Sequence, residues 1–294
     1  MGDHAPENWL CRSGEPSASG NRGGIDDFMC AQRAAKIFDE SAIDYSICTL
    51  VTRKQQYGEM IASFRSGGFL EPSCEYLYLD NSAENSWDAY RGYNLFLNVA
   101  RGKYIILCRQ DILLLADGRS RLDEIIAELD RLDPNWGLLG NAGGYRPGQL
   151  ALRISDPRGP DQRVGELPAR VRSLDENFIV VRRSANLALS RDLSGFHFYG
   201  TDICMIGDLL GYTAYVVDFH LLHKGGGICD AVFYQAYDDI AGKYRRAFRP
   251  RYVQTTCATL FVSGSRVLQF LLSRAKSIAT AAYLSKLRRA FFNS

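Results

Sequence analysis

The stretch KYIILCRQDILLL, residues 103–115, contains two apolar runs that are separated by Arg109, Gln110 and Asp111. An unpaired charge buried in a protein core is energetically costly. The polar triplet therefore marks either the end of a strand at the surface or a functional site. We expect residues 103–110 to form a buried strand that leaves the core at Asp111.

The residues on both sides of this stretch alternate between predicted strands and predicted helices. Apolar strands are predicted at 44–52, 74–82 and 174–184, and helical spacing is found at 53–68, 86–102 and 119–131. This order predicts an α/β fold, in which a mostly parallel central sheet carries helices on both faces. The proline-containing, charged stretch 145–173 predicts a long excursion or a hairpin insertion.

The composition is that of an ordinary globular protein. The chain has 294 residues, of which 46% are hydrophobic and 23% charged. No window approaches the ~18 uninterrupted apolar residues of a spanning helix, so we expect a cytoplasmic protein. The eight cysteines are scattered without a CxxC pair, which indicates reduced thiols and no zinc site.

The charge is distributed unevenly along the chain. From Lys243 to the end there are eleven basic residues and no acidic one, whereas the preceding 242 residues hold 24 basic against 33 acidic residues. We therefore predict three parts: a disordered tail at 1–24, a folded domain at 25–242, and a basic, largely helical extension at 243–294. Such an extension suggests an anionic partner surface.

Polar side chains follow three of the predicted strands. They are Thr49 and Thr52, then Asp80-Asn81-Ser82, then Arg109-Gln110-Asp111. Because the carboxyl ends of parallel strands meet at one edge, where ligands bind in open α/β sheets, we expect these residues to lie together. The alternative for Asp80-Asn81-Ser82 is a simple turn, since these residue types favour turns.

A second candidate feature is His223, which is followed by Lys224 and three glycines. A lone histidine near a strand end is often structural. Here the following loop offers backbone amides and a lysine to phosphate oxygens. Together, Asp111 and His223 would supply one oxygen and one nitrogen ligand to Mn²⁺ or Mg²⁺ and leave positions for a diphosphate and water.

A resemblance to a known family is visible in the order of several segments. These are SICTLVTR, YLYLDNS, YNLFLNVARGKYIILCRQDILL, LDENFIVVRRS, FHFYGTDICMIGDLLGYTAYVVD and HKGG. Their order resembles family 2 glycosyltransferases of the GT-A fold, in particular a bacterial subgroup with a QD pair where most members have Asp-x-Asp. The resemblance spans residues 44 to about 227.

The resemblance implies an inverting, metal-dependent glycosyltransferase. Such an enzyme would move a sugar from a nucleotide-sugar, by family habit a UDP-sugar, to a glycan or lipid-linked acceptor in bacterial surface polysaccharide synthesis. It also implies roles for individual positions. Asp111 and His223 would bind the metal; Asp202, Asp175 and Glu176 would be the catalytic candidates; and the nucleotide would be bound by Thr49, Thr52, Asp80, Asn81, Asn94, Arg109, Gln110 and Lys224.

Two positions depart from the family pattern. Arg109-Gln110 replaces the first acid of the metal motif, and Gly200 stands at the usual position of the base. Asp202, Asp175 and Glu176 therefore remain open as the base, and Asp202 is also compatible with a helix N-cap. The departures favour an alternative function, a non-catalytic sugar-nucleotide or glycan binding module. A nucleotidyltransferase is disfavoured because the first strand carries no glycine-rich loop.

The end of the extension has apolar residues at loosely helical spacing, flanked by arginine and lysine. One interpretation is an interfacial helix on an anionic membrane surface, which would place the protein peripherally at the inner face of the plasma membrane. A packing helix or a homo-oligomer contact is an equal alternative. No recognition motif accompanies the charge, so we expect no nucleic-acid partner.

Overall fold

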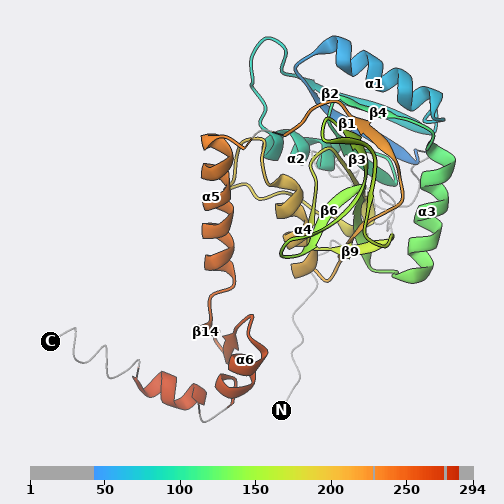
Figure 1. Ribbon diagram of the computed structural model, residues 1–294. Coiled ribbons are helices and arrows are strands. Elements are labelled where there is room, and N and C mark those ends of the chain that lie inside the picture. Colours follow the sequence, from blue (N-terminus) through green and yellow to red (C-terminus); the bar gives the residue numbers. More distant parts are fainter. Residues whose placement is uncertain (1–42, 228, 275–276, 285–294) are drawn as a thin grey trace, which may run out of the picture. The chain divides into compact units, whose positions relative to one another are not determined.

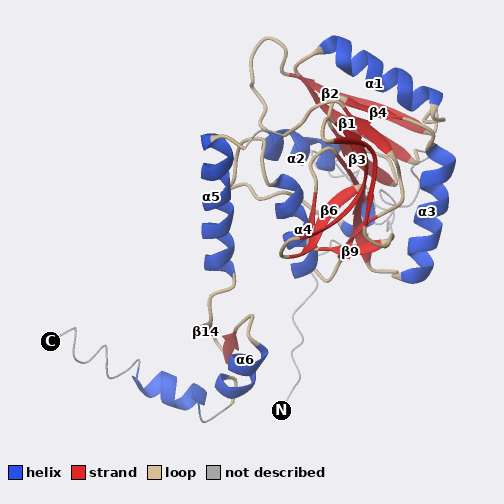
Figure 2. Ribbon diagram, in the orientation of Figure 1, coloured by secondary structure: helices blue, strands red, loops and turns tan. Residues whose placement is uncertain are grey.

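The computed structural model describes residues 43–227, 229–274 and 277–284 (Figure 1). These residues belong to one compact unit, Ser41–Ser294. The predicted tail at 1–24 and the last ten residues of the basic extension lie outside the described residues. Helices flank the strands of the folded domain, as the colouring in Figure 2 shows.

The central sheet has seven strands in the order β2-β1-β3-β11-β5-β12-β9. As predicted, β1 pairs in parallel with β2 and with β3, and β12 pairs in parallel with β5. The sheet is nevertheless mixed, because β11 runs antiparallel between β3 and β5. The bounds are β1 Tyr45–Val51, β2 Cys74–Asp80, β3 Tyr104–Cys108, β5 Trp136–Gly140, β9 Ala169–Val171, β11 Phe178–Arg182 and β12 Thr213–Val216.

Four helices cover the two faces of this sheet. They are α1 (Lys54–Ser66), α2 (Ala89–Val99), α3 (Arg119–Leu132) and α4 (Tyr199–Leu209). The side chains of β3 alternate between two hydrophobic clusters, with Ile106 among residues of α1 and α3, and Ile105 among residues of α2 and α4. This alternation is what a strand buried on both faces requires. The predicted α/β class with helices on both faces is confirmed.

The end of the stretch 103–115 lies in a second sheet. Its order is β10-β6-β7-β13-β4, and β8 pairs with β7. The apolar residues after Asp111 form β4 in this second sheet, so residues 103–115 contribute to two sheets. The region 145–173 folds largely as hairpins. The bounds are β4 Ile112–Leu114, β6 Ala142–Arg146, β7 Gln149–Asp156, β8 Gly159–Val164, β10 Ser173–Leu174 and β13 Leu221–His223.

The basic extension begins inside α5 (Ala231–Ala247) and continues into a two-stranded hairpin and a short helix. The hairpin consists of β14 (Arg251–Gln254) and β15 (Thr259–Val262), and α6 is Arg266–Leu272. The extension was predicted to be largely helical, and its hairpin was not predicted. A short 3-10 helix at Arg183–Ala185 follows β11. No helix among the described residues is long and apolar enough to cross a membrane.

Candidate functional site

Asp111 and His223 are brought together by the pairing of two strands. β4 begins directly after Asp111 and runs antiparallel to β13, which places His223 opposite Ile112. The backbone N–H of Lys224 donates to the carbonyl of Asp111 at 2.9 Å. As a result, His223 Nε2 lies 3.5 Å from Asp111 Oδ1. Asp111 and His223, which are far apart in the sequence, therefore lie next to each other at the junction of the two sheets.

The carboxylate of Asp111 is buried but charged. Arg109 Nε donates to Asp111 Oδ1 at 3.2 Å. Burial alone would raise the pKa of Asp111, but the proximity of His223 and the charge of Arg109 hold this pKa at about 2. Asp111 is therefore ionised at neutral pH and offers a negatively charged oxygen.

The imidazole of His223 offers an unused nitrogen. His223 Nε2 is buried and makes no hydrogen bond within the described part of the chain. Gly225 keeps the space beside it open, because a Cβ at this position would lie 2.6 Å from Asp111 Oδ2 and 3.3 Å from His223 Nε2. A carboxylate oxygen and a free imidazole nitrogen beside an open space fit a divalent cation. Within the described residues, no three His, Cys, Asp or Glu side chains gather to hold a metal, so further ligands would come from a substrate or water.

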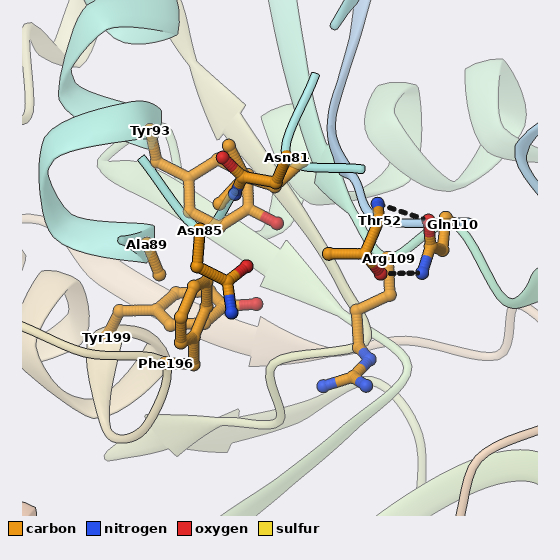
Figure 3. A pocket seen from close by; sticks show the side chains of 10 residues that line it. Thr52, Asn81, Asn85, Ala89, Tyr93, Arg109, Gln110, Phe196 and Tyr199 are labelled. Atoms are coloured by element: carbon orange, nitrogen blue, oxygen red, sulfur yellow. Dashed lines mark hydrogen bonds between the residues drawn. The ribbon is translucent and has the colours of Figure 1, made fainter. Parts of the chain in front are cut away.

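A pocket of about 230 Å³ lies at the carboxyl ends of the strands (Figure 3). We call it the strand-end pocket. Polar side chains line one part of it and aromatic rings another, and Tyr93 and Tyr199 pack with their ring centroids 5.0 Å apart. Arg109 reaches it while also contacting Asp111. The lining residues are Leu50, Thr52, Asn81, Asn85, Ala89, Tyr93, Arg109, Gln110, Phe196 and Tyr199.

Gln110 fixes one edge of the strand-end pocket. Its Oε1 accepts hydrogen bonds from the backbone N–H groups of Thr52 and Arg53, both at 2.8 Å. Its Nε2 donates to Thr52 Oγ1 at 2.7 Å, so the amide holds Thr52 from two sides (Figure 3). Gln110, which with Arg109 stands where the resemblance to family 2 glycosyltransferases leads us to expect an acid, therefore joins the end of β1 to the beginning of α1.

A second pocket, of about 520 Å³, lies against the hairpins of the second sheet and includes Asp175 and Glu176. We call it the hairpin pocket. The backbone N–H groups of Tyr199 and Gly200, at the beginning of α4, donate to the Glu176 carboxylate. Burial and, secondarily, the negative charge of Asp175 nevertheless raise the pKa of Glu176 to about 8. Glu176 is thus a carboxyl group that can accept or release a proton near neutral pH.

The other two catalytic candidates lie in different surroundings. Asp202 is completely buried, and its carboxylate accepts hydrogen bonds from Ser190 N, Ser190 Oγ and Tyr244 Oη at 2.6–2.8 Å. All of these donors belong to the protein, and the buried carboxylate has no exposed surface to offer to a substrate. Asp175 is exposed, and its Oδ1 accepts from the backbone and side-chain amides of Asn177.

Gly200, which the resemblance to family 2 glycosyltransferases places at the position of the base, has no room for a side chain. A Cβ at Gly200 would lie only 2.3 Å from the carbonyl oxygen of Leu174. Any side chain at this position would require the backbone of β10 or α4 to move. The packing of α4 against β10 therefore excludes a carboxylate here. The hairpin pocket is lined instead by Asp156, Asp175 and Glu176, and the pKa of Glu176 is raised.

The predicted nucleotide-binding residues divide into two groups. Thr52, Asn81, Arg109 and Gln110 line the strand-end pocket, and the remaining four do not. Thr49 is fully buried beside the Cys108 thiol, and Asn94 exchanges two hydrogen bonds with the backbone of Leu189. These contacts give Thr49 and Asn94 structural roles. Asp80 pairs with Lys54 at 2.9 Å, and Lys224 pairs with Glu59.

Several residues of the strand-end pocket were not predicted from the sequence. Tyr93, Tyr199, Phe196 and Asn85 were missed, although Ala89 and Tyr93 are four residues apart on one face of α2. That spacing was a usable signal for Tyr93. Phe196 and Tyr199 carry no such pattern, because Phe196 lies in the loop before α4 and Tyr199 is the first residue of that helix.

Comparison with curated proteins identifies a relative. The chain is 37% identical over 232 residues to "ATP synthase subunits region ORF 6" of Fuscovulum blasticum, and the match covers 77% of this chain and 93% of that protein. The chain belongs to the family of this protein. The name of this relative states no activity for the ORF 6 family. No model of a known protein family matches the chain.

Solved structures provide two remote likenesses to this ORF 6 family member. One is a mannosyltransferase, PcManGT from Pyrobaculum calidifontis in complex with GDP-Man and Mn2+, with a TM-score of 0.44 and 12% identity. That match covers 69% of this chain and 64% of the mannosyltransferase chain. The other is A197 from STIV, with a TM-score of 0.36 and 8% identity over 64% of this chain and 97% of that chain. At these scores neither likeness indicates a function.

Proposed function

We propose that the protein is an inverting, metal-dependent glycosyltransferase that uses a nucleotide-sugar donor. The observation that carries this proposal is the Asp111–His223 pair, to which Arg109, a lining residue of the strand-end pocket, donates a hydrogen bond. The hairpin pocket adds Glu176, a carboxyl group of raised pKa. The order of sequence motifs that resembles family 2 glycosyltransferases supports the same reading. We further propose that the donor is a UDP-sugar and that the acceptor is a glycan or a lipid-linked molecule.

The strand-end pocket is suited to the nucleoside part of the donor. Tyr93, Tyr199 and Phe196 offer ring faces, and Asn81, Asn85 and Thr52 offer hydrogen-bonding groups at its wall. Arg109 leads from this pocket to Asp111, so its guanidinium can neutralise a diphosphate held between the two. Asp111 and His223 would hold a divalent cation there, which when bound stabilises negative charge on the departing diphosphate.

Glu176 is the proposed base for the acceptor hydroxyl. In a single displacement the acceptor oxygen bonds to the anomeric carbon while the bond to the diphosphate oxygen breaks. The hydroxyl proton passes to the Glu176 carboxylate, and the nucleoside diphosphate leaves with the bonding electrons. General base catalysis of this kind contributes typically ~10²–10⁴-fold in rate. Attack from the side opposite the leaving group inverts the anomeric centre.

The test measures nucleoside diphosphate release from a panel of sugar nucleotides in the presence of Mn²⁺. We expect the substitution Asp111→Asn to reduce release by about 10²-fold or more, since it removes the negative ligand. Asp208→Asn is the matched control, because Asp208 forms only an exposed pair with Arg172 at the end of α4. Calorimetric titration of Mn²⁺ without donor gives a second readout, in which Asp111→Asn should abolish binding. Equal release and equal Mn²⁺ binding by both variants would contradict the proposal.

A second candidate function is binding of a sugar nucleotide without transfer. It is favoured by the junction, where the described part of the chain brings two candidate metal ligands together and no third, and by Gly200, whose surroundings exclude a side chain. This function predicts that calorimetry detects binding of a sugar nucleotide and that Glu176→Gln leaves this affinity unchanged. It also predicts no diphosphate release with any acceptor. Turnover that depends on Glu176 would decide for the transferase.

A further inference from the structure

The hairpin of the C-terminal extension has one covered face and one bare face. Tyr252 and Phe261 lie opposite each other with ring centroids 4.9 Å apart, and Phe261 is buried. The helix α6 packs on this face, since the Tyr252 hydroxyl donates to the Leu272 carbonyl at 3.3 Å and Gln269 Nε2 donates to the Phe261 carbonyl at 2.8 Å. Because side chains alternate between the faces of a strand, Val253, Leu260 and Val262 project from the opposite face. All three of these side chains are exposed.

The helix α6 adds more exposed apolar surface. None of its seven residues is buried, and Val267 and Phe270 are 67% and 62% exposed. Leu271 follows Val267 by one helical turn, so the two lie on one side of the helix. Soluble monomers rarely leave so many large apolar side chains together in water. This surface therefore requires a partner.

Arginines flank the exposed apolar side chains of α6. Arg266 begins the helix. The Arg274 guanidinium lies 4.4 Å from the centre of the Phe270 ring. No acidic residue occurs anywhere from Lys243 to the end of the chain. The positive charge of this segment therefore favours an anionic partner.

We propose that this surface binds an anionic lipid bilayer at its interface. The tail surface, as we call it, consists of Val267, Phe270 and Leu271 on the outer side of α6, with Arg266 and Arg274 beside them. The bare face of the hairpin points away from α6 and is not part of this surface. The apolar side chains enter the boundary between headgroups and acyl chains, and the arginines contact lipid phosphates. A second copy of the same surface fits less well, because two such surfaces would bring arginines together without an acid between them.

The bilayer is contacted rather than crossed. No described helix is long enough to span it, and α6 and the hairpin are both short. Binding should therefore be reversible and depend on both the charge of the lipid and the apolar side chains. It is independent of the proposed transferase activity, which requires only the two pockets.

The test is sedimentation of the full-length protein with vesicles of equal parts phosphatidylcholine and phosphatidylglycerol. We expect binding to these vesicles and none to vesicles of phosphatidylcholine alone. The double variant Arg266→Gln/Arg274→Gln should bind about 30-fold more weakly, since each basic residue near an anionic surface contributes ~1 kcal/mol. Raising the salt so that the Debye length falls from about 10 Å to about 3 Å should weaken binding of the unsubstituted protein in the same direction.

The apolar contribution is tested by Val267→Ser/Phe270→Ser, which should lower vesicle affinity by about 100-fold. The matched control is Leu132→Ser/Leu209→Ser, at two equally exposed positions on α3 and α4. Thermal unfolding of each variant verifies that the fold is retained. Equal binding by both serine variants, absence of vesicle binding, or a dimer in solution that Val267→Ser/Phe270→Ser dissociates would each overturn the proposal. Diphosphate release in solution should be the same for all these variants, so the proposed transferase activity is tested separately.

Discussion

Glu176 is a residue where burial and a neighbouring charge act in the same direction. Its pKa of about 8 means that the carboxylate, the form that can accept a proton, accumulates only as pH rises through this value. If Glu176 is the base, diphosphate release by the transferase should increase with pH and level off above about 8. The measurement is a pH profile of kcat/KM, in which Glu176→Gln should be inactive throughout.

Asp175→Asn is the informative companion to Glu176→Gln. Because the charge of Asp175 raises the pKa of Glu176, this variant should move the midpoint of the profile to lower pH without abolishing turnover. A flat profile for the unsubstituted protein, or full activity of Glu176→Gln, would remove Glu176 from the mechanism.

Asp202 illustrates the opposite situation, a carboxylate whose partners all belong to the protein. Asp202→Asn keeps the shape but leaves part of the Ser190 and Tyr244 hydrogen bonding without an acceptor. We expect the free energy of unfolding to fall by about 2 kcal/mol, with turnover per folded molecule unchanged. Urea denaturation together with diphosphate release measures both quantities. A variant of normal stability that has lost turnover would restore Asp202 as the candidate base.

At the scale of elements, the junction of β1 with α1 depends on the amide of Gln110. Gln110→Ala removes the acceptor that binds the N–H groups of Thr52 and Arg53. We expect a loss of about 1 kcal/mol in the free energy of unfolding and faster hydrogen exchange at these two amides. Gln110→Glu keeps both acceptor interactions and should keep the protection. Unchanged exchange in Gln110→Ala would show that the junction is held by other contacts.

The elements also show where sequence reasoning succeeded and where it could not. The pattern of apolar residues located β1, β2, β3 and the helices that follow them, because the strands are short runs rich in apolar residues and the helices carry apolar residues at helical spacing. It could not show that β11 inserts antiparallel, since strand direction is determined by the connection and not by residue pattern. The apolar run of β1 did contain unused information. Thr49 lies inside this run, between Cys48 and Leu50, and so could have been assigned to the core.

The candidate site was predictable to a similar degree. Asp111 and His223 were identified because each polar residue interrupts or follows an apolar run. Glu176 could not be ranked above Asp202 from sequence, since the difference is one of burial and hydrogen-bond partners. The aromatic wall was missed because Tyr93 and Tyr199 come from separate helices that only the fold brings together.

At the scale of the whole molecule, α5 joins the basic extension to the acidic domain. Tyr244 of α5 donates to the buried Asp202 carboxylate at 2.8 Å, and Lys243 pairs with Asp192. Deleting residues 249–294 should therefore leave the melting temperature nearly unchanged. Deleting 231–294 should lower it by ~5 °C or more, because Asp202 loses a buried donor. Scanning calorimetry distinguishes the two, and equal melting temperatures would mean that α5 is not part of the cooperative unit.

The three residues that connect β3 to β4 act as a spacer of fixed length between two sheets. β3 is in register with β1 and β11, while β4 is in register with β13, so neither strand can slide to absorb a change. One inserted or deleted residue would turn the side chains of one strand to its other face. Asp111 and His223 would then no longer meet. A substitution in this segment changes one side chain. A change in its length would instead disrupt the junction of the two sheets at the point where Asp111 meets His223.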